Sequence, residues 1–267
     1  MKMKEIPKFR STWYTNDVVG VAKGIASSGS FNTMSILGDT LKDAGCEEDY
    51  FLKHCNPKRK RSHPWWLLAT ILGLDTDIPL IFNWGKVYKL LGMKKEFDEF
   101  IKLNPIPFSK NRVWYLPIIK GLRPEKVFAV MEEQKAMPKL TYSSKIRLTK
   151  NDRDPRFGSY IVGFTANMEA DEKNKGWSSE ERWEQNYKDI TLLERLFLDL
   201  AYFLETENNL DKKSETLCSG SIEYLGRYIP SVTSDRLSIS YIGWHSQHEC
   251  SENLRPRSVV FHQLAVA

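Results

Sequence analysis

The sequence predicts an α+β protein in which a helical N-terminal module precedes a mixed α+β domain. Three observations predict this class. Apolar residues recur at helical spacing through residues 1–104, residues 104–107 (Asn-Pro-Ile-Pro) have the composition of a linker, and short alternating runs typical of strands follow. We therefore predict a helical module at residues 1–104 and an α+β domain at residues 105–267.

The helical module is predicted from capping residues and from the spacing of apolar side chains. Thr15 or Asn16 is expected to cap the first helix, and Asn32 or Thr33 the second, which Gly45 ends as a C-cap glycine. Four further helices are predicted over residues 50–52, 65–74, 84–91 and 96–103. The segment 65–74 is apolar nearly all round, which predicts a buried helix.

The second domain mixes helices and strands. Pro124 is expected at the first position of a helix that runs to about Gln134. The most regular helical pattern lies at residues 190–204, with Thr191 as its cap. Residues 151–155 form a turn cluster. Strands are predicted over residues 141–148, 160–165, 228–232, 237–241 and 258–261.

Composition excludes several classes of protein. The chain has 267 residues and 41% hydrophobic residues, enough for a core without disulfides or a structural metal. No apolar run approaches the length of a membrane-spanning helix. The basic N-terminus has no apolar segment behind it and therefore does not resemble a secretion signal. We expect a cytoplasmic protein whose four cysteines are reduced.

The positive charge is concentrated in the first part of the chain. Residues 1–110 carry 17 basic and 12 acidic residues, residues 111–267 carry 22 of each, and the net charge is +5. Lys58, Arg59, Lys60 and Arg61 are consecutive, with tryptophans at 65 and 66 nearby. This run is the basis of an alternative function, nucleic-acid binding. We favour a solvated loop, because four charges release few counterions.

No familiar catalytic motif is present. The chain lacks the phosphate-binding, dinucleotide, metalloprotease and nucleophile-elbow patterns. His245, His248 and Cys250 are spaced as H-x-x-H-x-C, which matches no zinc signature, so we interpret them as loop residues. A metal-assisted enzyme is a third hypothesis, which would use the carboxylates Asp152, Asp154, Glu169, Asp171 and Glu172. For these carboxylates we favour ordinary ion pairing at the surface over a catalytic role. We predict no catalytic residue, no metal and no cofactor.

Residues 222–253 differ in composition from the rest of the domain. They are rich in Tyr, Ser, Gly and His, and they include Trp244. Binding loops have this composition, because aromatic side chains supply rigid contact area while Ser and Gly supply adaptable hydrogen bonds. By composition alone, an ordinary solvent-facing sheet explains the segment better. We treat 222–253 as a candidate binding segment.

Residues 13–74 resemble a short helical module found in planctomycete-type proteins of unassigned function. The resemblance rests on Trp13, Val18, Val19, Ala22, Ile25, Phe31, the run Ile36-Leu37-Gly38-Asp39-Thr40-Leu41, Ala44-Gly45-Cys46, Leu52-Lys53-His54-Cys55, Trp66 and Gly73. It implies a small accessory module without an activity of its own.

Residues 120–262 resemble uncharacterised hypervariable proteins of candidate-phyla bacteria. The motifs are Asn151-Asp152-Arg153-Asp154-Pro155-Arg156, Gly158, Tyr160, Glu169-Ala170-Asp171-Glu172, Ile190-Thr191-Leu192-Leu193-Glu194-Arg195-Leu196, Tyr202-Phe203, Leu210-Asp211, Thr216-Leu217-Cys218-Ser219-Gly220-Ser221 and Leu254-Arg255-Pro256-Arg257-Ser258-Val259-Val260. Those proteins are similar to the products of diversity-generating retroelements, which display changeable residues on a C-type-lectin-like scaffold.

The resemblance implies a non-enzymatic, receptor-like protein with a C-type-lectin-like C-terminal part. Its variable segment would be residues 222–253, and its partner a protein or another macromolecule. The aromatic anchors would be Tyr224, Tyr228, Tyr241, Trp244 and His245. The full set of implied ligand-binding residues is Tyr224, Tyr228, Ser231, Thr233, Ser238, Ser240, Tyr241, Trp244, His245, Gln247 and His248.

Overall fold

The computed structural model describes residues 8–56, 64–107, 111–134, 136, 138–140, 148–223, 226–234 and 240–265. Helices and strands are mixed along the chain, which confirms the predicted α+β class. The predicted strand 141–148 lies outside the described residues except for its last position. Residues 237–239 of the predicted strand 237–241 also lie outside them.

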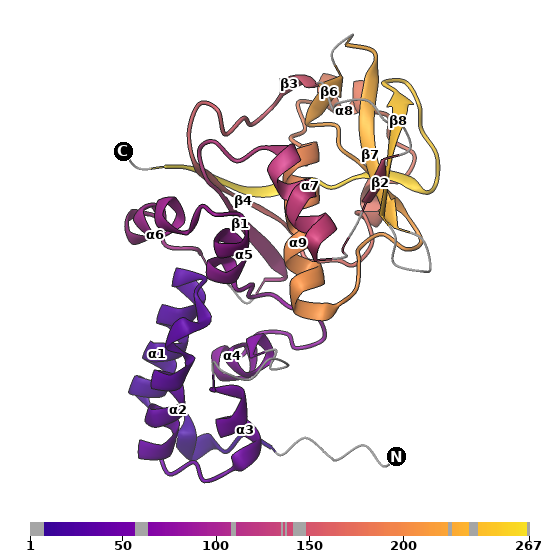
Figure 1. The fold of residues 1–267 in the computed structure, drawn as a ribbon. Coiled ribbons are helices and arrows are strands. Elements are labelled where there is room, and N and C mark those ends of the chain that lie inside the picture. The colour runs from indigo at the N-terminus through magenta and orange to yellow at the C-terminus, as the bar shows by residue number, and fades with distance from the viewer. Residues whose placement is uncertain are drawn as a thin grey trace.

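The first helices form the lower part of the molecule in Figure 1. They are α1 (Asn16–Ser28), α2 (Met34–Asp43), α3 (Asp49–His54) and α4 (Trp65–Leu72). Thr15 caps α1 by accepting a hydrogen bond from the backbone N–H of Val18. Gly29 follows α1 in the left-handed conformation that glycine adopts readily. Of the two predicted caps, Thr15 or Asn16, the structure uses Thr15.

Two more helices, α5 (Trp84–Leu90) and α6 (Lys94–Leu103), lie beside the α+β part. Trp84 stacks on Phe197 of the later helix α9, with ring centroids 5.0 Å apart. The Tyr88 hydroxyl donates to the carbonyl of Pro117 at 2.5 Å. One apolar core therefore continues across residues 104–107, where the sequence predicts a linker.

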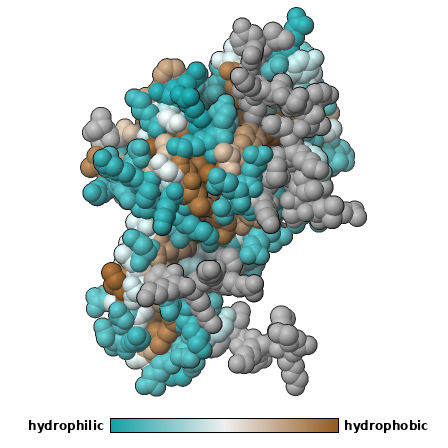
Figure 2. All heavy atoms as spheres, in the orientation of Figure 1, coloured by the Kyte–Doolittle hydropathy of each residue, from teal (hydrophilic) through white to brown (hydrophobic). Residues whose placement is uncertain are grey.

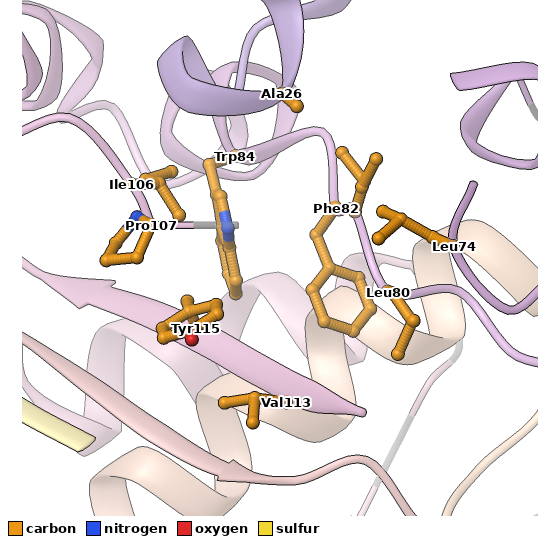
Figure 3. Close-up of a pocket in the computed structure, with 10 residues that line it drawn as sticks. Ala26, Leu74, Leu80, Phe82, Trp84, Ile106, Pro107, Val113 and Tyr115 are labelled. Atoms are coloured by element: carbon orange, nitrogen blue, oxygen red, sulfur yellow. The ribbon is translucent and has the colours of Figure 1, made fainter. Parts of the chain in front are cut away.

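Figure 3 shows the apolar junction between the two parts, where side chains from α1, the α4–α5 connection and β1 meet. The cavity among them is only about 20 Å³, room for about one water molecule. Gly29 makes this close packing possible, because a Cβ there would lie 2.8 Å from side-chain atoms of both Trp84 and Ile106. The junction is a packed contact whose cavity is far smaller than a typical ligand site of a few hundred Å³.

The first sheet consists of β1 (Val113–Ile118), β4 (Tyr160–Thr165) and β10 (Val259–Leu264), with β4 in the middle and both pairings antiparallel. The predicted strand at 160–165 is confirmed. The sequence did not predict β1. Its burial is continuous from Leu116 to Ile118, so it lacks the alternation by which a strand is recognised.

The second sheet has the order β2 (Pro138–Leu140), β8 (Ser240–Ser246), β7 (Tyr228–Ser234), β5 (Glu215–Leu217) and β9 (Leu254–Pro256). Strands β7 and β8 form an antiparallel pair, and β5 pairs parallel with β9. A two-stranded sheet joins β3 (Leu148–Asn151) to β6 (Ser221–Glu223). In Figure 1, β6, β7 and β8 lie at the top of the molecule.

The long helix α9 (Leu192–Thr206) is central to this part, where it contacts β1, β7 and the helix α7 (Pro124–Glu133). A capping box begins α9: Thr191 accepts from the N–H of Glu194, and Glu194 accepts from the N–H of Thr191. A short helix, α8 (Ser179–Glu184), has a capping box of its own.

Figure 2 shows that hydrophilic residues cover most of this face of the molecule, with hydrophobic residues gathered in a band across its middle. Within the described ranges, no helix has the length and apolar character needed to cross a membrane.

Candidate functional site

Several predicted site residues lie outside the part of the chain that the structure describes. They are Tyr224, Ser238 and the alternative nucleic-acid run Lys58, Arg59, Lys60 and Arg61. Ser240 begins β8, but only its backbone is described. The other predicted residues lie on β7, on β8 or in the turn that follows β8.

The register of β7 against β8 divides the predicted residues between two faces. Paired residues of antiparallel strands share a face. Ile229 pairs with His245, Ser231 with Gly243, and Thr233 with Tyr241. We call the face formed by Ser231, Thr233, Tyr241, Gly243 and His245 the polar face.

The opposite face of the hairpin carries Tyr228, Pro230, Val232, Ile242 and Trp244. Val232 and Ile242 belong to the main core, and Trp244 packs against it. Tyr228, at the end of the strand, is 45% exposed. The expected aromatic anchors therefore do not share one face, because Tyr228 and Trp244 point away from Tyr241 and His245.

The polar face holds a chain of hydrogen bonds. Ser231 is fully buried, and its hydroxyl donates to Glu215 Oε1 on β5. His245 Nε2 lies 2.9 Å from that oxygen, and His245 Nδ1 lies 2.8 Å from Glu249 Oε1. The histidine therefore connects β5 to the turn after β8.

Electrostatics in this cluster favour its charged forms. Burial lowers the pKa of His245, but the hydrogen bonds and charges of Glu215 and Glu249 outweigh burial and raise the pKa above its usual value. Burial raises the pKa of Glu215, and its bonds to His245 and Ser231 reverse this and hold the pKa below its usual value. The ionised forms are the favoured ones for both side chains.

Gly243 leaves the space in which this cluster forms. A Cβ at this position would lie 2.7 Å from the Ser231 hydroxyl oxygen, 3.1 Å from Glu215 Oε1 and 3.5 Å from His245 Nε2. Any side chain at residue 243 must displace at least the hydroxyl. The sequence shows the glycine, but only the strand pairing shows that its missing side chain leaves space for Ser231, Glu215 and His245.

The turn at residues 246–250 is attached to α8 as well. His248 Nδ1 lies 2.5 Å from Glu180 Oε2, and the backbone N–H of Glu180 donates to the carbonyl of Gln247 at 3.1 Å. Residues 248–253 are all exposed. The turn thus presents exposed side chains while contacts to α8 and to His245 hold it in place.

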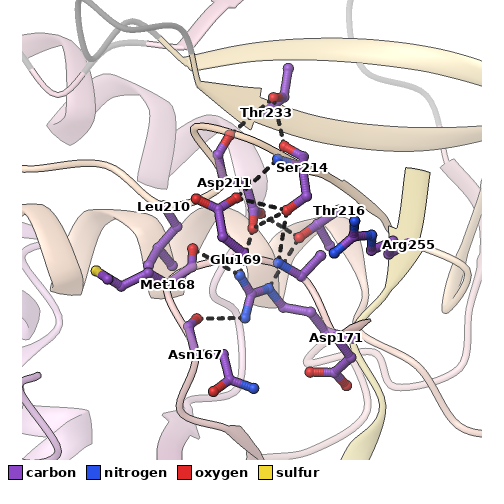
Figure 4. A network of polar contacts seen from close by, with 12 residues as sticks. Asn167, Met168, Glu169, Asp171, Leu210, Asp211, Ser214, Thr216, Thr233 and Arg255 are labelled. Atoms are coloured by element: carbon purple, nitrogen blue, oxygen red, sulfur yellow. Dashed lines mark hydrogen bonds and ion pairs between the residues drawn. The ribbon is translucent and has the colours of Figure 1, made fainter. Parts of the chain in front are cut away.

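Beneath the polar face lies a buried ionic network that the sequence interpretation missed, and Figure 4 shows its aspartate, Asp211, between Thr216 and Ser214. Asp211 Oδ2 lies 2.8 Å from Arg195 Nη2, and Asp211 Oδ1 lies 2.6 Å from Arg257 Nη2. All three side chains are fully buried. Thr216 on β5 also donates to Asp211. Asp211 therefore ties α9 to β5 and to the segment after β9.

The same network fixes the neighbouring loops. Arg257 donates to the carbonyls of Asn167 and Met168, and Thr233 donates to the carbonyls of Asp211 and Ser214. The three charged residues of the network all lie in motifs that carry the resemblance. Those motifs therefore mark the residues, but the sequence alone does not show that they meet in one buried cluster.

The acidic residues at 152–172 have structural contacts instead of a shared site. Asp154 pairs with Arg156, and Glu169 accepts from the backbone N–H groups of Lys213 and Ser214. Asp171 is buried and accepts from the N–H of Ser258. In the described part of the chain, no three His, Cys, Asp or Glu side chains are grouped so that they could hold a metal ion.

A surface pocket of about 510 Å³ adjoins the network, and its charges are largely paired. Arg112 lies 2.8 Å from Asp75, and Arg255 pairs with Glu172. Apolar contacts come from Ile78, Met168 and Ala170. This balance of charge selects neither an anion nor a cation, so we do not include the pocket in the candidate site.

Comparison with known proteins identified no relative: no family model, curated protein or solved structure matches the chain.

Proposed function

We propose that this protein is a non-enzymatic binding protein that recognises a protein or another macromolecule on a C-type-lectin-like scaffold. The proposed binding surface consists of Tyr241 and His245 on the polar face, the half-buried Gln247, and the exposed residues 248–253. Ser231 and Thr233 have a supporting role, because their hydroxyls are engaged by Glu215 and by backbone carbonyls.

The observation that carries this proposal is that a buried ionic network holds the scaffold in place while the turn after β8 exposes polar side chains. The buried Arg195–Asp211–Arg257 network holds α9, β5 and the segment after β9 in one arrangement. The turn above it exposes residues 248–253. Binding proteins commonly place contact residues on loops that a rigid scaffold positions. The composition of residues 222–253, rich in Tyr, Ser and His, supports the same interpretation.

The proposal is tested by comparing two double variants with the unmodified protein. Gln247→Ala/His248→Ala removes side chains from the proposed surface. Lys95→Ala/Glu99→Ala alters exposed side chains on α6 and is the matched control. Macromolecules retained from cell extract by the immobilised protein are identified and purified, and the Kd of each is measured by calorimetry.

We expect the surface variant to bind at least about tenfold more weakly, a change of about 1.4 kcal/mol, while the control variant keeps its Kd. Equal affinity of all three proteins would place the binding surface elsewhere. Failure of any macromolecule to bind the unmodified protein would contradict the proposed function itself.

A further inference from the structure

His245 lies between carboxylates from two different segments. Glu215 belongs to β5, which is part of the scaffold, and Glu249 belongs to the exposed turn. Each ring nitrogen lies within 3.0 Å of one carboxylate oxygen. The side chain of His245 is only 19% exposed, so water competes weakly for these two contacts.

The protonation state of the ring determines how many of these contacts are favourable. A neutral imidazole has one N–H donor and one acceptor nitrogen, so one of the two carboxylates would face a lone pair. An imidazolium donates from both nitrogens and satisfies both carboxylates with charge-assisted hydrogen bonds. The arrangement of the two acids therefore selects the protonated ring.

We propose that His245 is a pH-dependent clasp, which fastens the turn at residues 246–250 to β5 when the ring is protonated and releases it when the proton is lost. This inference rests on the proposed function, because the same turn carries part of the proposed binding surface. The clasp makes recognition by that surface stronger in mildly acidic than in alkaline solution.

The surrounding groups define the pH range of the clasp. Glu215 from β5 and Glu249 from the turn are the charged groups that act on the ring, and β7 contributes the uncharged Ser231. Burial opposes protonation of His245, but the two carboxylates reverse this and raise its pKa. The clasp is therefore complete below the ordinary histidine pKa of about 6.5 and is lost as the pH rises through the raised value.

Toward acid, the clasp depends on Glu215. The pKa of this carboxyl is held below its usual value, because the bonds from His245 and Ser231 outweigh its burial. The clasp therefore persists below the usual glutamate range and is lost only as the pH falls through that depressed pKa. Between these limits both partners carry their charges.

Release of the clasp loosens the turn without detaching it. His248 still contacts Glu180 of α8, and the N–H of Glu180 still donates to the carbonyl of Gln247. A sensitive reporter is the backbone N–H of Glu249, which donates to the carbonyl of Ser246 at 3.0 Å inside the turn. Its protection from hydrogen exchange measures how well the turn is held.

The test uses the full chain without any ligand, so that it does not depend on the proposed function. NMR follows the titration of the His245 ring and the protection factor of the Glu249 amide from pH 5 to pH 9. Protection factors are used because they exclude the intrinsic pH dependence of exchange. The test variant is His245→Gln, which does not titrate. The matched control is His262→Gln, on β10 of the other sheet.

We expect the ring of His245 to titrate above pH 6.5 and the protection factor to fall about tenfold across that titration in the unmodified protein and in the control, an effect of the size expected for a charged hydrogen bond. In His245→Gln this tenfold fall should be absent. Gly243→Ala, which displaces the partners of the ring, should lower the protection factor already at pH 5.5.

An equal pH dependence in His245→Gln, or a His245 ring that titrates below pH 6.5, would overturn the clasp. If the clasp is observed but no macromolecule binds the protein, the proposed function fails and the pH-dependent contact stands. If a macromolecule binds but the clasp is not observed, the clasp fails and the proposed function stands. The Kd of that macromolecule will then not depend on the charge of His245.

Discussion

Replacing Asp211 by asparagine tests whether the buried ionic network holds the α+β part together. Asn has nearly the same volume as Asp, so the change removes charge without creating a cavity. Asp211 accepts from Arg195 Nε at 3.0 Å and Nη2 at 2.8 Å, from Arg257 Nη2 at 2.6 Å, and from Thr216. In the variant, an N–H₂ group replaces one carboxylate oxygen and faces these donors.

The expected loss follows from what remains after the change. Both guanidinium groups are still fully buried, and the remaining carboxylate in contact with Arg195 is Asp199, at 3.3 Å. Removal of one partner from a buried ion pair typically costs about 3–5 kcal/mol. We expect Asp211→Asn to lower the free energy of unfolding by about 3–5 kcal/mol, a large part of a total of roughly 5–15 kcal/mol.

The effect also has a defined pH dependence. Burial raises the pKa of Asp211, but Arg257 and Arg195 outweigh burial and hold the pKa below its usual value. A depressed pKa stabilises the fold above the unfolded-state value of about 3.9, and this stabilisation is lost as the pH falls through the folded-state value. The difference between the unmodified protein and the variant should therefore shrink in acid.

Urea unfolding at pH 7, followed by tryptophan fluorescence and circular dichroism, measures the change. The control is Asp39→Asn, which removes an exposed pair with Lys42 and should have a far smaller effect. A loss below about 1 kcal/mol for Asp211→Asn, or one no larger than that of the control, would refute the reasoning, because it falls well short of the cost of an unpaired buried charge.

Three further predictions concern α9 and its contacts. Thr191→Ala removes the α9 cap and should cost about 1 kcal/mol in urea unfolding, most of which Thr191→Ser restores; an unchanged midpoint for Ala would contradict the capping role. Burial raises the pKa of Glu205 to about 7, so its carboxyl destabilises the fold by about 3 kcal/mol as the pH rises from 4.5 through 7. Glu205→Gln should therefore raise the Tm at pH 8 and change it little at pH 5, and an equal shift at both would be inconsistent with this titration. Trp84→Ala removes the stack on Phe197 and should cost about 3–5 kcal/mol. Calorimetry should still show one transition, and two separate transitions would mean that the core does not join the two parts.

The sequence alone determined most of the helices, because their signals are local, but the short helix α8 was not predicted. Thr191 was predicted as a cap, as was Thr15 or Asn16, and both threonines accept the expected backbone N–H group. Asn32 or Thr33 was also predicted as a cap, but Thr33 at the start of α2 makes no side-chain capping hydrogen bond. Each helical bond joins residues four apart, so spacing and capping carry most of the information. The α+β class followed from the same local signals.

The strands were harder to predict from the sequence. Strand β1 was missed. Strand β7 was predicted over residues 228–232, although four consecutive residues from Ile229 to Val232 are buried and its burial does not alternate. Both faces of these strands are covered, and burial on both faces removes the period of two. The neighbours that cover them come from distant parts of the chain and leave no local pattern.

The candidate site was determined only in part by the sequence. The sequence placed the predicted binding residues in one segment, but strand pairing turned Trp244 to the core and set His245 beside Glu215, thirty positions away. The tertiary structure also buried Arg195 and Arg257, residue types that are normally exposed. An arginine can be buried only where a carboxylate compensates its charge, and Asp211 reaches both only in the folded chain. Local patterns therefore determined the helices, whereas long-range pairing of charges and strands decided which side chains form the site.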